Sequence, residues 1–193
     1  MRIFVLSVML CTLTVSVHGQ GQPEGIFLGA KAPDFTGTDQ FGRQVNLRQL
    51  AKTEPVLLVF YRGYWSPQCT RLLARLQDSL FLFTDRQISV VAVSPESDSC
   101  RSLTLQKTRA GFSLVWDSAH LISKRYDVLQ ELSESQLARY RSGGIDLVKW
   151  NAPNGPQLPV PSVFLIGKDY TVTYRFFDPE QKRRISVKEL LQQ

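Results

Sequence analysis

Two stretches of the chain are continuously apolar and rich in β-branched residues, and each is followed by a helical pattern. Residues 56–61 and 88–93 form the two stretches, which are typical of strands covered on both faces. Apolar residues then recur at helical spacing from Cys69 to Phe83, and a second helix is expected over about 98–110. The order strand, helix, strand, helix predicts an α/β domain.

Shorter patterns extend this core on both sides. Asp39 to Gly42 is expected to turn a short hairpin, and residues 46–51 to form one helical turn. Residues 160–166 and 171–177 are expected to pair as a hairpin, followed by a last helix over about 186–192. Between them we expect a strand over 112–115, a helix over 119–126 and, within the poorly patterned residues 127–154, a helix over 133–140. These elements predict one layered α/β sandwich around a mixed sheet.

The N-terminus has the pattern of an export signal. One positive charge precedes an apolar stretch over 3–17, and small residues follow it, so we predict a cleaved signal peptide at 1–19 and a secreted or periplasmic protein. The stretch is shorter than the ~20 residues that span a membrane. A lipid anchor at Cys11 is the alternative. A flexible leader is expected over 20–31 and the folded domain over 32–193.

Charge and histidine content narrow the function classes. The 23 Lys and Arg outnumber the 17 Asp and Glu, but the excess is spread along the chain without the clustering of a nucleic-acid groove. A basic, solvated surface is the simpler interpretation. His120 has no partner at ligand spacing, so no metal site is predicted.

Cys69 is the strongest candidate for chemistry, because it stands where the first buried strand gives way to a turn and a helix. A thiol at a helix N-terminus is exposed to the positive end of the macrodipole, which favours the thiolate. Without the signal peptide, Cys100 is the other cysteine of the chain. In an oxidising compartment the pair is compatible with a structural or a catalytic disulfide.

Five motifs in order carry a resemblance to a known family. They are Gly29–Phe35, Phe60–Cys69, Val93–Glu96, Leu158–Ile166 and Phe176–Pro179. Together they resemble the peroxiredoxin-like group of the alkyl hydroperoxide reductase/thiol-specific antioxidant family, over about residues 29–192. The resemblance implies a thioredoxin-like three-layer sandwich with a central mixed sheet, and a thiol-dependent peroxidase without a cofactor.

The resemblance also implies roles for individual residues. Cys69 would attack a hydrogen peroxide or organic hydroperoxide and become a sulfenic acid, and Ser66 would donate a hydrogen bond. Backbone N–H groups of residues 67–69 would stabilise the developing charge. Cys100, 31 residues further on, is either a resolving cysteine or a structural one. An external thiol reductant such as a thioredoxin-like protein would complete the cycle, and homodimers occur in such folds.

The same resemblance suggests the pocket. Arg62, Trp65 and Pro67 are expected around the thiol from the near side. Pro161 resembles the cis-proline that faces the active cysteine in thioredoxin folds, and a trans proline at a strand entrance is the alternative.

Several positions depart from the family pattern. Ser66 replaces the first cysteine of Trp-Cys-Pro-x-Cys, Arg62 replaces a proline, and Arg71 or Leu72 stands where an acidic residue is usual. The usual arginine before the late strand is replaced by Val160 and Pro161, so Arg62 either substitutes for it or is solvated. A catalytically silent thioredoxin-fold binding protein and a one-cysteine thiol-disulfide oxidoreductase are therefore alternative functions.

Overall fold

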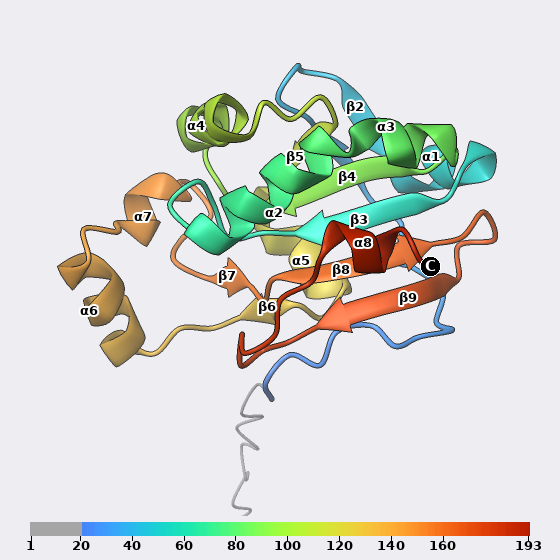
Figure 1. The fold of residues 1–193 in the computed structure, drawn as a ribbon. Helices are drawn as coiled ribbons and strands as arrows, with labels where there is room; N and C mark the ends of the chain where they lie inside the picture. Colours follow the sequence, from blue (N-terminus) through green and yellow to red (C-terminus); the bar gives the residue numbers. More distant parts are fainter. Residues whose placement is uncertain (1–20) are drawn as a thin grey trace, which may run out of the picture.

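A computed structural model describes residues 21–193, and the predicted signal peptide lies outside them. Its centre is a five-stranded mixed sheet with the order β5-β4-β3-β8-β9 (Figure 1). The strands are β3 (Val56–Phe60), β4 (Ser89–Ser94), β5 (Ser113–Trp116), β8 (Ser162–Ile166) and β9 (Val172–Phe177). β3, β4 and β5 run parallel to one another. On the other side of β3, β8 pairs antiparallel with β3, and β9 pairs antiparallel with β8. The predicted mixed sheet is confirmed.

Side-chain alternation along β3 divides the core into two layers. Leu58 and Phe60 face one layer, and Leu57 and Val59 face the other. The first layer is covered by α1 (Leu47–Thr53) and α5 (Leu121–Arg125), and the second by α2 (Pro67–Asp78), α3 (Leu80–Asp85), α4 (Asp98–Thr108) and α8 (Val187–Leu190) (Figure 1). Helices on both faces of the sheet make the three-layer sandwich.

The smaller elements follow the sequence pattern in part. β1 (Thr36–Thr38) and β2 (Gln44–Asn46) form the predicted hairpin, and α6 (Glu134–Ser142) matches the predicted helix. A capping box between Ser133 and Gln136 starts α6. The sequence did not predict β6 (Leu129–Gln130), α7 (Leu147–Trp150), β7 (Leu158–Pro159) or the 3-10 turn η1 (Ser118–His120).

The helix expected from Cys69 to Phe83 is two helices. Ser79, with φ −109° and ψ 11°, leaves the helical conformation, so α2 ends there and α3 begins. Leu73 and Leu76 of α2 and Phe83 of α3 nevertheless pack into the same layer. The apolar spacing therefore continues across a change of helix axis.

Residues 25–31 correct the expected flexible leader. Gly29 N–H donates to Val172 O at 2.9 Å, Val172 N–H donates to Ala30 O at 2.9 Å, and Lys31 forms an antiparallel bridge with Thr171. Gly25 N–H adds a bond of 2.8 Å to Asp127 O. The segment lies along the exposed edge of β9 because that edge offers unpaired backbone groups.

The expected cis peptide bond before Pro161 is also corrected. Within residues 21–193 the cis peptide bond is Ala152–Pro153, and Val160–Pro161 is trans. Val160 N–H donates to Val128 O at 2.7 Å, so the chain passes extended from β7 into β8 and a trans linkage continues its direction.

Across residues 21–193, no helix combines the length and apolar character needed to cross a membrane.

Candidate active site

Cys69 is the third residue of α2, in the turn that faces the carboxyl end of β3. Ser66 is the N-cap, and its Oγ accepts from Cys69 N–H at 3.4 Å. Pro67 occupies the first helical position, where its missing N–H costs nothing. The local sequence thus fixes both the start of the helix and the place of the thiol.

The thiol itself is enclosed, with 3% of the residue exposed. Burial raises the pKa of Cys69 above its ordinary value. Three groups act to lower it, from the largest effect to the smallest: the Arg62 N–H, the Ser66 hydroxyl and the Arg62 guanidinium. The expectation that the helix N-terminus would favour the thiolate is therefore corrected for the buried thiol, because desolvation outweighs the donors.

The backbone group that reaches the sulfur is not one of those predicted. Arg62 N lies 3.5 Å from Cys69 Sγ and donates to it. Pro67 has no N–H, and the N–H of Cys69 is already bonded to Ser66. The chain before the helix, rather than the first helical turn, therefore supplies the donor to the sulfur.

Arg62 is buried, with 6% of the residue exposed, which excludes the solvated alternative. Its guanidinium donates to Pro159 O at 3.2 Å, to the Tyr140 hydroxyl at 3.1 Å and to Gln130 Oε1 at 3.1 Å. These acceptors are all neutral, and no ion pair among residues 21–193 includes Arg62. A buried cation without a carboxylate stabilises any anion that forms nearby.

The short pairing of β6 with β7 places this guanidinium. Gln130 lies opposite Leu158 in that pair, so its side chain and the Pro159 carbonyl reach Arg62 together. Tyr140 completes the set from α6. None of the three acceptors was predicted, because each belongs to a two-residue strand or to a helix distant in sequence.

Glu96 is a buried carboxylate that sequence reasoning did not identify as part of the site. It accepts from Tyr64 N–H at 2.6 Å and from the Thr104 hydroxyl at 2.8 Å, with Ser94 Oγ at 3.4 Å. Burial raises the pKa of Glu96, and its negative charge also acts to raise the pKa of Cys69. Glu96 therefore connects the loop before α2 to α4 through hydrogen bonds. Its charge also acts on the pKa of Cys69 in the direction opposite to that of the Arg62 guanidinium.

Gly63 makes that loop possible. Its φ of +145° is a conformation that other residues rarely adopt, and an added Cβ would lie 2.7 Å from Trp65 Nε1 and 3.0 Å from Glu96 Oε1. The loop can therefore approach Glu96 closely only with glycine at this position.

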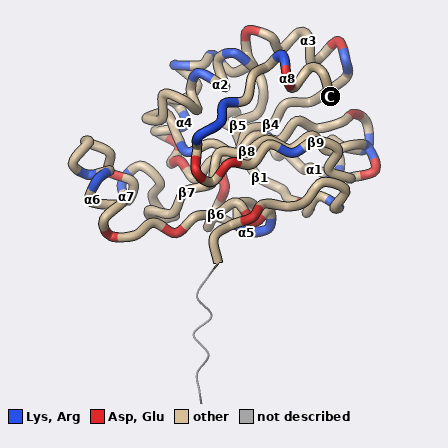
Figure 2. The backbone as a smooth tube through the Cα atoms, turned by 60° about the horizontal axis from the view of Figure 1, so that its bottom comes forward, with Lys and Arg blue, Asp and Glu red and all other residues tan. Residues whose placement is uncertain are grey.

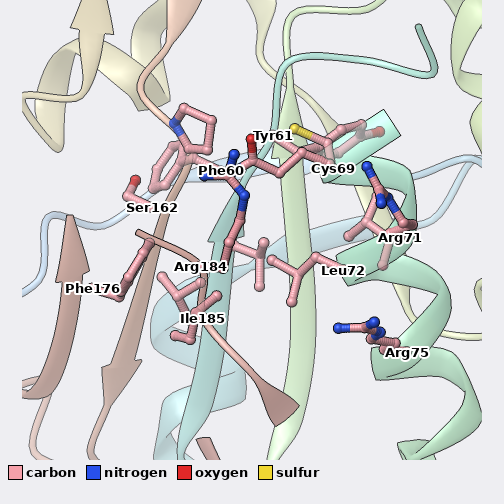
Figure 3. A pocket seen from close by; sticks show the side chains of 15 residues that line it. Phe60, Tyr61, Cys69, Arg71, Leu72, Arg75, Ser162, Phe176, Arg184 and Ile185 are labelled. Atoms are coloured by element: carbon pink, nitrogen blue, oxygen red, sulfur yellow. The ribbon is translucent and has the colours of Figure 1, made fainter. Parts of the chain in front are cut away.

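A pocket of about 240 Å³ opens beside the thiol (Figure 3). Around its interior, next to Cys69, lie the apolar side chains of Leu72, Phe176 and Ile185. The arginines at its mouth are Arg71, Arg75 and Arg184.

The predicted pocket residues divide between this pocket and other places. Pro161 lines it together with Cys69, whereas Arg62 lines a second cavity with Gln130 and Tyr140. Trp65 packs edge-to-face on Tyr140, with ring centroids 5.3 Å apart, and lies outside the lining, as does Pro67. The pocket wall opposite α2 comes instead from Phe176, Arg184 and Ile185, of which only Phe176 belongs to a motif recognised in the sequence.

Cys100 lies at the third position of α4, buried and free of a disulfide, as Cys69 is. Cys100 shares one face of α4 with Thr104 and Lys107. Thr104 donates to Glu96 Oε2 at 2.8 Å and Lys107 donates to Tyr64 O at 3.1 Å, so this face is turned towards the loop before α2. The structure thus places both cysteines around this loop, in separate environments.

His120 is buried, and its Nε2 lies 3.2 Å from Asn154 O. Burial lowers the pKa of His120. Within the part of the chain that the structure describes, no three His, Cys, Asp or Glu side chains gather as a metal site.

Comparisons with known proteins agree on one family. Residues 28–175 match the model of the AhpC/TSA family. Over 104 residues the chain is 31% identical to the chloroplastic peroxiredoxin Q of Sedum lineare and 29% identical to that of Triticum aestivum, covering 54% of this chain in each case and 55% and 48% of the relatives. The chain thus spans about half the length of these relatives.

Solved structures share the fold at low identity. The peroxidoxin BcpB of Mycobacterium tuberculosis gives a TM-score of 0.62 at 21% identity, covering 78% of this chain and 84% of that one. The yeast mitochondrial 1-Cys peroxiredoxin, studied for its thiol resolving mechanism via glutathione/thioredoxin systems, gives 0.66 at 16% identity, covering 86% and 73%. These likenesses agree with the thioredoxin-like architecture.

Proposed function

Because the chain belongs to the AhpC/TSA family, we propose that it is a thiol-dependent peroxidase whose nucleophile is Cys69. The observation that supports this most directly is the surroundings of the thiol. Its sulfur accepts from Arg62 N–H, borders a pocket, and lies within the field of a buried guanidinium that has no carboxylate partner among the described residues. The named relatives, which are peroxiredoxins, support the same activity.

The proposed reaction begins when the Cys69 thiol releases its proton to solvent. The thiolate attacks the terminal oxygen of the hydroperoxide, an S–O bond forms, and the O–O bond breaks. The leaving alkoxide, or hydroxide from hydrogen peroxide, takes a proton from water. The sulfur is oxidised by two electrons to a sulfenic acid, and the peroxide is reduced to an alcohol or to water.

Arg62 and Ser66 have complementary roles in this proposal. The Arg62 N–H and guanidinium stabilise negative charge on the sulfur, and the Ser66 hydroxyl acts in the same direction. Arg62 thereby takes the place of the arginine that relatives carry near Pro161. Burial works against these donors and raises the pKa of Cys69.

Return to the thiol requires reducing equivalents from outside the chain. If Cys100 attacks the sulfenic acid, a Cys69–Cys100 disulfide and water form, and an external dithiol such as a thioredoxin-like protein then reduces the disulfide. Without that step, an external thiol resolves Cys69 directly. We propose the Cys100 route because Cys100 shares the face of α4 from which Lys107 donates to Tyr64 O at 3.1 Å.

The test is rapid mixing of the reduced protein with hydrogen peroxide and with an organic hydroperoxide, with a sulfenate trap and mass mapping. We expect saturable oxidation at Cys69, followed by loss of trap labelling as a disulfide to Cys100 appears. Oxidation at the rate of a free thiol would overturn the peroxidase and favour the silent binding protein. Rapid thiol exchange without peroxide reaction would indicate a one-cysteine oxidoreductase.

Export and self-association are also proposed. The signal pattern of residues 1–19 supports a secreted or periplasmic protein, and N-terminal sequencing of the product in its host would detect cleavage near residue 20. Sedimentation of the purified protein would show whether it forms a homodimer, as the fold allows.

A further inference from the structure

The pocket beside Cys69 combines a small apolar interior with a basic mouth. Leu72 from α2, Phe176 at the end of β9, and Ile185 from the segment before α8 lie around its interior (Figure 3). Its volume of about 240 Å³ is below the ~300–1,000 Å³ typical of sites for drug-sized ligands. The interior therefore suits an apolar body no larger than a small aryl or short alkyl group.

Three arginines stand at the mouth on two opposing walls. Arg71 and Arg75 are exposed on α2, and Arg184 is exposed on the C-terminal segment (Figure 3). This segment contains the basic run 182–184, which lies near α2 (Figure 2). The lining contains no Asp or Glu, and no ion pair among residues 21–193 uses any of the three arginines.

Among the described residues, the side chains of Arg71 and Arg184 bond only to neutral carbonyl groups, and the Arg75 side chain makes no hydrogen bond. Arg71 Nε donates to Pro67 O at 2.9 Å, and Arg184 Nη1 donates to Gln181 O at 2.6 Å. Neither bond neutralises the positive charge. Like charges around a concave mouth with apolar walls concentrate the positive potential there, and a guanidinium binds a carboxylate with charge-assisted hydrogen bonds.

We infer that this pocket selects hydroperoxides that carry a carboxylate on a small aryl or short alkyl body. The inference rests on the proposed peroxidase function and specifies its substrate class. The apolar body occupies the interior and brings the hydroperoxide to Cys69, while the carboxylate meets the arginines at the mouth. Hydrogen peroxide has no group for either contact, so it reacts without this selection.

The test compares two substrates of nearly equal shape. Cumene hydroperoxide with a para-carboxylate is anionic, and its para-carboxamide is neutral. At about 10 mM salt we expect the rate constant for Cys69 oxidation to be about tenfold larger for the acid, and the ratio to approach one at about 0.5 M salt. Equal rate constants for the two at low salt would overturn the inference.

Arginine variants locate the effect. Arg75→Gln and Arg184→Gln should each reduce the acid-to-amide ratio about two- to fivefold, the size of one solvated ion pair. Arg71 is left in place because it bonds to the start of α2. The matched control is Arg86→Gln, at the exposed end of α3 outside the pocket lining. An equal loss in the control would mean that only the overall charge of the protein matters, and would overturn the inference.

A binding measurement separates the inference from the proposed function. Inert 4-isopropylbenzoate should protect Cys69 from alkylation at lower concentration than 4-isopropylbenzamide does. If both hydroperoxides react rapidly but the benzoate and the benzamide protect Cys69 equally, the proposed substrate class is wrong and the proposed peroxidase activity stands. If neither hydroperoxide reacts but the benzoate protects, the peroxidase is wrong and the anion-selective pocket stands.

Discussion

Cys69 and Cys100 occupy equivalent positions in two helices. Each is the third residue of its helix, behind a serine at the N-cap, and each is a buried free thiol. The Ser66 side chain accepts from the Cys69 N–H, whereas Ser97 makes no side-chain capping bond. Position in a helix is therefore the same for the two thiols, and their surroundings differ.

Those surroundings separate the two thiols chemically. Cys69 receives the Arg62 N–H and borders the pocket, whereas Cys100 borders neither that pocket nor the cavity at Arg62. At the start of α4, the carboxylate of Asp98, two residues before Cys100, forms an ion pair with Arg101 at 2.6 Å. The proposed role of Cys69 therefore depends on access to the pocket and on a fixed donor, in addition to the helix N-terminus that both thiols share.

The largest effect should come from exchanging each thiol for a hydroxyl. Cys69→Ser should reduce peroxide consumption by at least about a thousandfold because it removes the nucleophile. Cys100→Ser should leave the first oxidation of Cys69 within about twofold and alter only the later, resolving step of the cycle. Single-turnover rates measure both effects. A slow first oxidation in Cys100→Ser would contradict the prediction that Cys100 acts only after Cys69 has been oxidised.

Next in size is the loss of Arg62. Arg62→Gln should slow Cys69 oxidation about tenfold to a hundredfold and move its pH profile to higher pH, since the guanidinium lowers the pKa of Cys69. Arg62→Lys, which keeps the charge, should recover part of the rate. Circular dichroism confirms folding of both variants. A folded Arg62→Gln protein with an unchanged pH profile would contradict the role of this cation.

Glu96→Gln should act in the opposite direction and more weakly. Removing the negative charge should lower the pKa of Cys69, and alkylation of Cys69 near pH 7 should become about two- to fivefold faster. The amide oxygen of Gln can still accept from Tyr64 N–H, so the loop is retained. Peptide mapping of the alkylated protein measures the rate for Cys69 separately. Slower alkylation would show that the carboxylate serves only to hold the loop.

The smallest expected effect is on stability. The pKa of Cys69 is raised in the folded state, so the folded protein keeps a proton that the unfolded chain releases above about pH 8.5. Stability should therefore fall as pH rises through that region, by no more than about 1.4 kcal/mol per pH unit. Urea unfolding between about pH 7.5 and 9.5 measures the slope, and Cys69→Ala should make it shallower. Equal slopes would mean that the thiol is not desolvated in solution.

Much of the fold was predictable because its signals are local. The continuous runs at β3 and β4 and the helical spacing of α2 depend on neighbouring residues, and they placed Cys69 at the start of its helix. The break at Ser79 was missed because apolar spacing does not report a small change in helix direction.

The parts of the site that were missed depend on contacts between distant residues. Arg62 meets Gln130 and Tyr140 only because two-residue strands pair across the chain, and such strands have no periodicity to detect. Glu96 was visible only as part of a motif, since its burial depends on α4. The balance between burial and hydrogen bonding at Cys69 likewise requires the complete fold.

The pocket has one consequence for how this protein can diversify. Phe176, Arg184 and Ile185 lie beyond residues 28–175, the span matched by the family model, while Cys69 lies within it. One wall of the pocket proposed to select the substrate is therefore encoded apart from the proposed nucleophile, whereas Arg71, Leu72 and Arg75 share α2 with Cys69. If Cys69 is the nucleophile as proposed, substitutions or length changes after Phe176 would reshape the pocket wall opposite α2 while leaving the surroundings of the thiol on α2 intact.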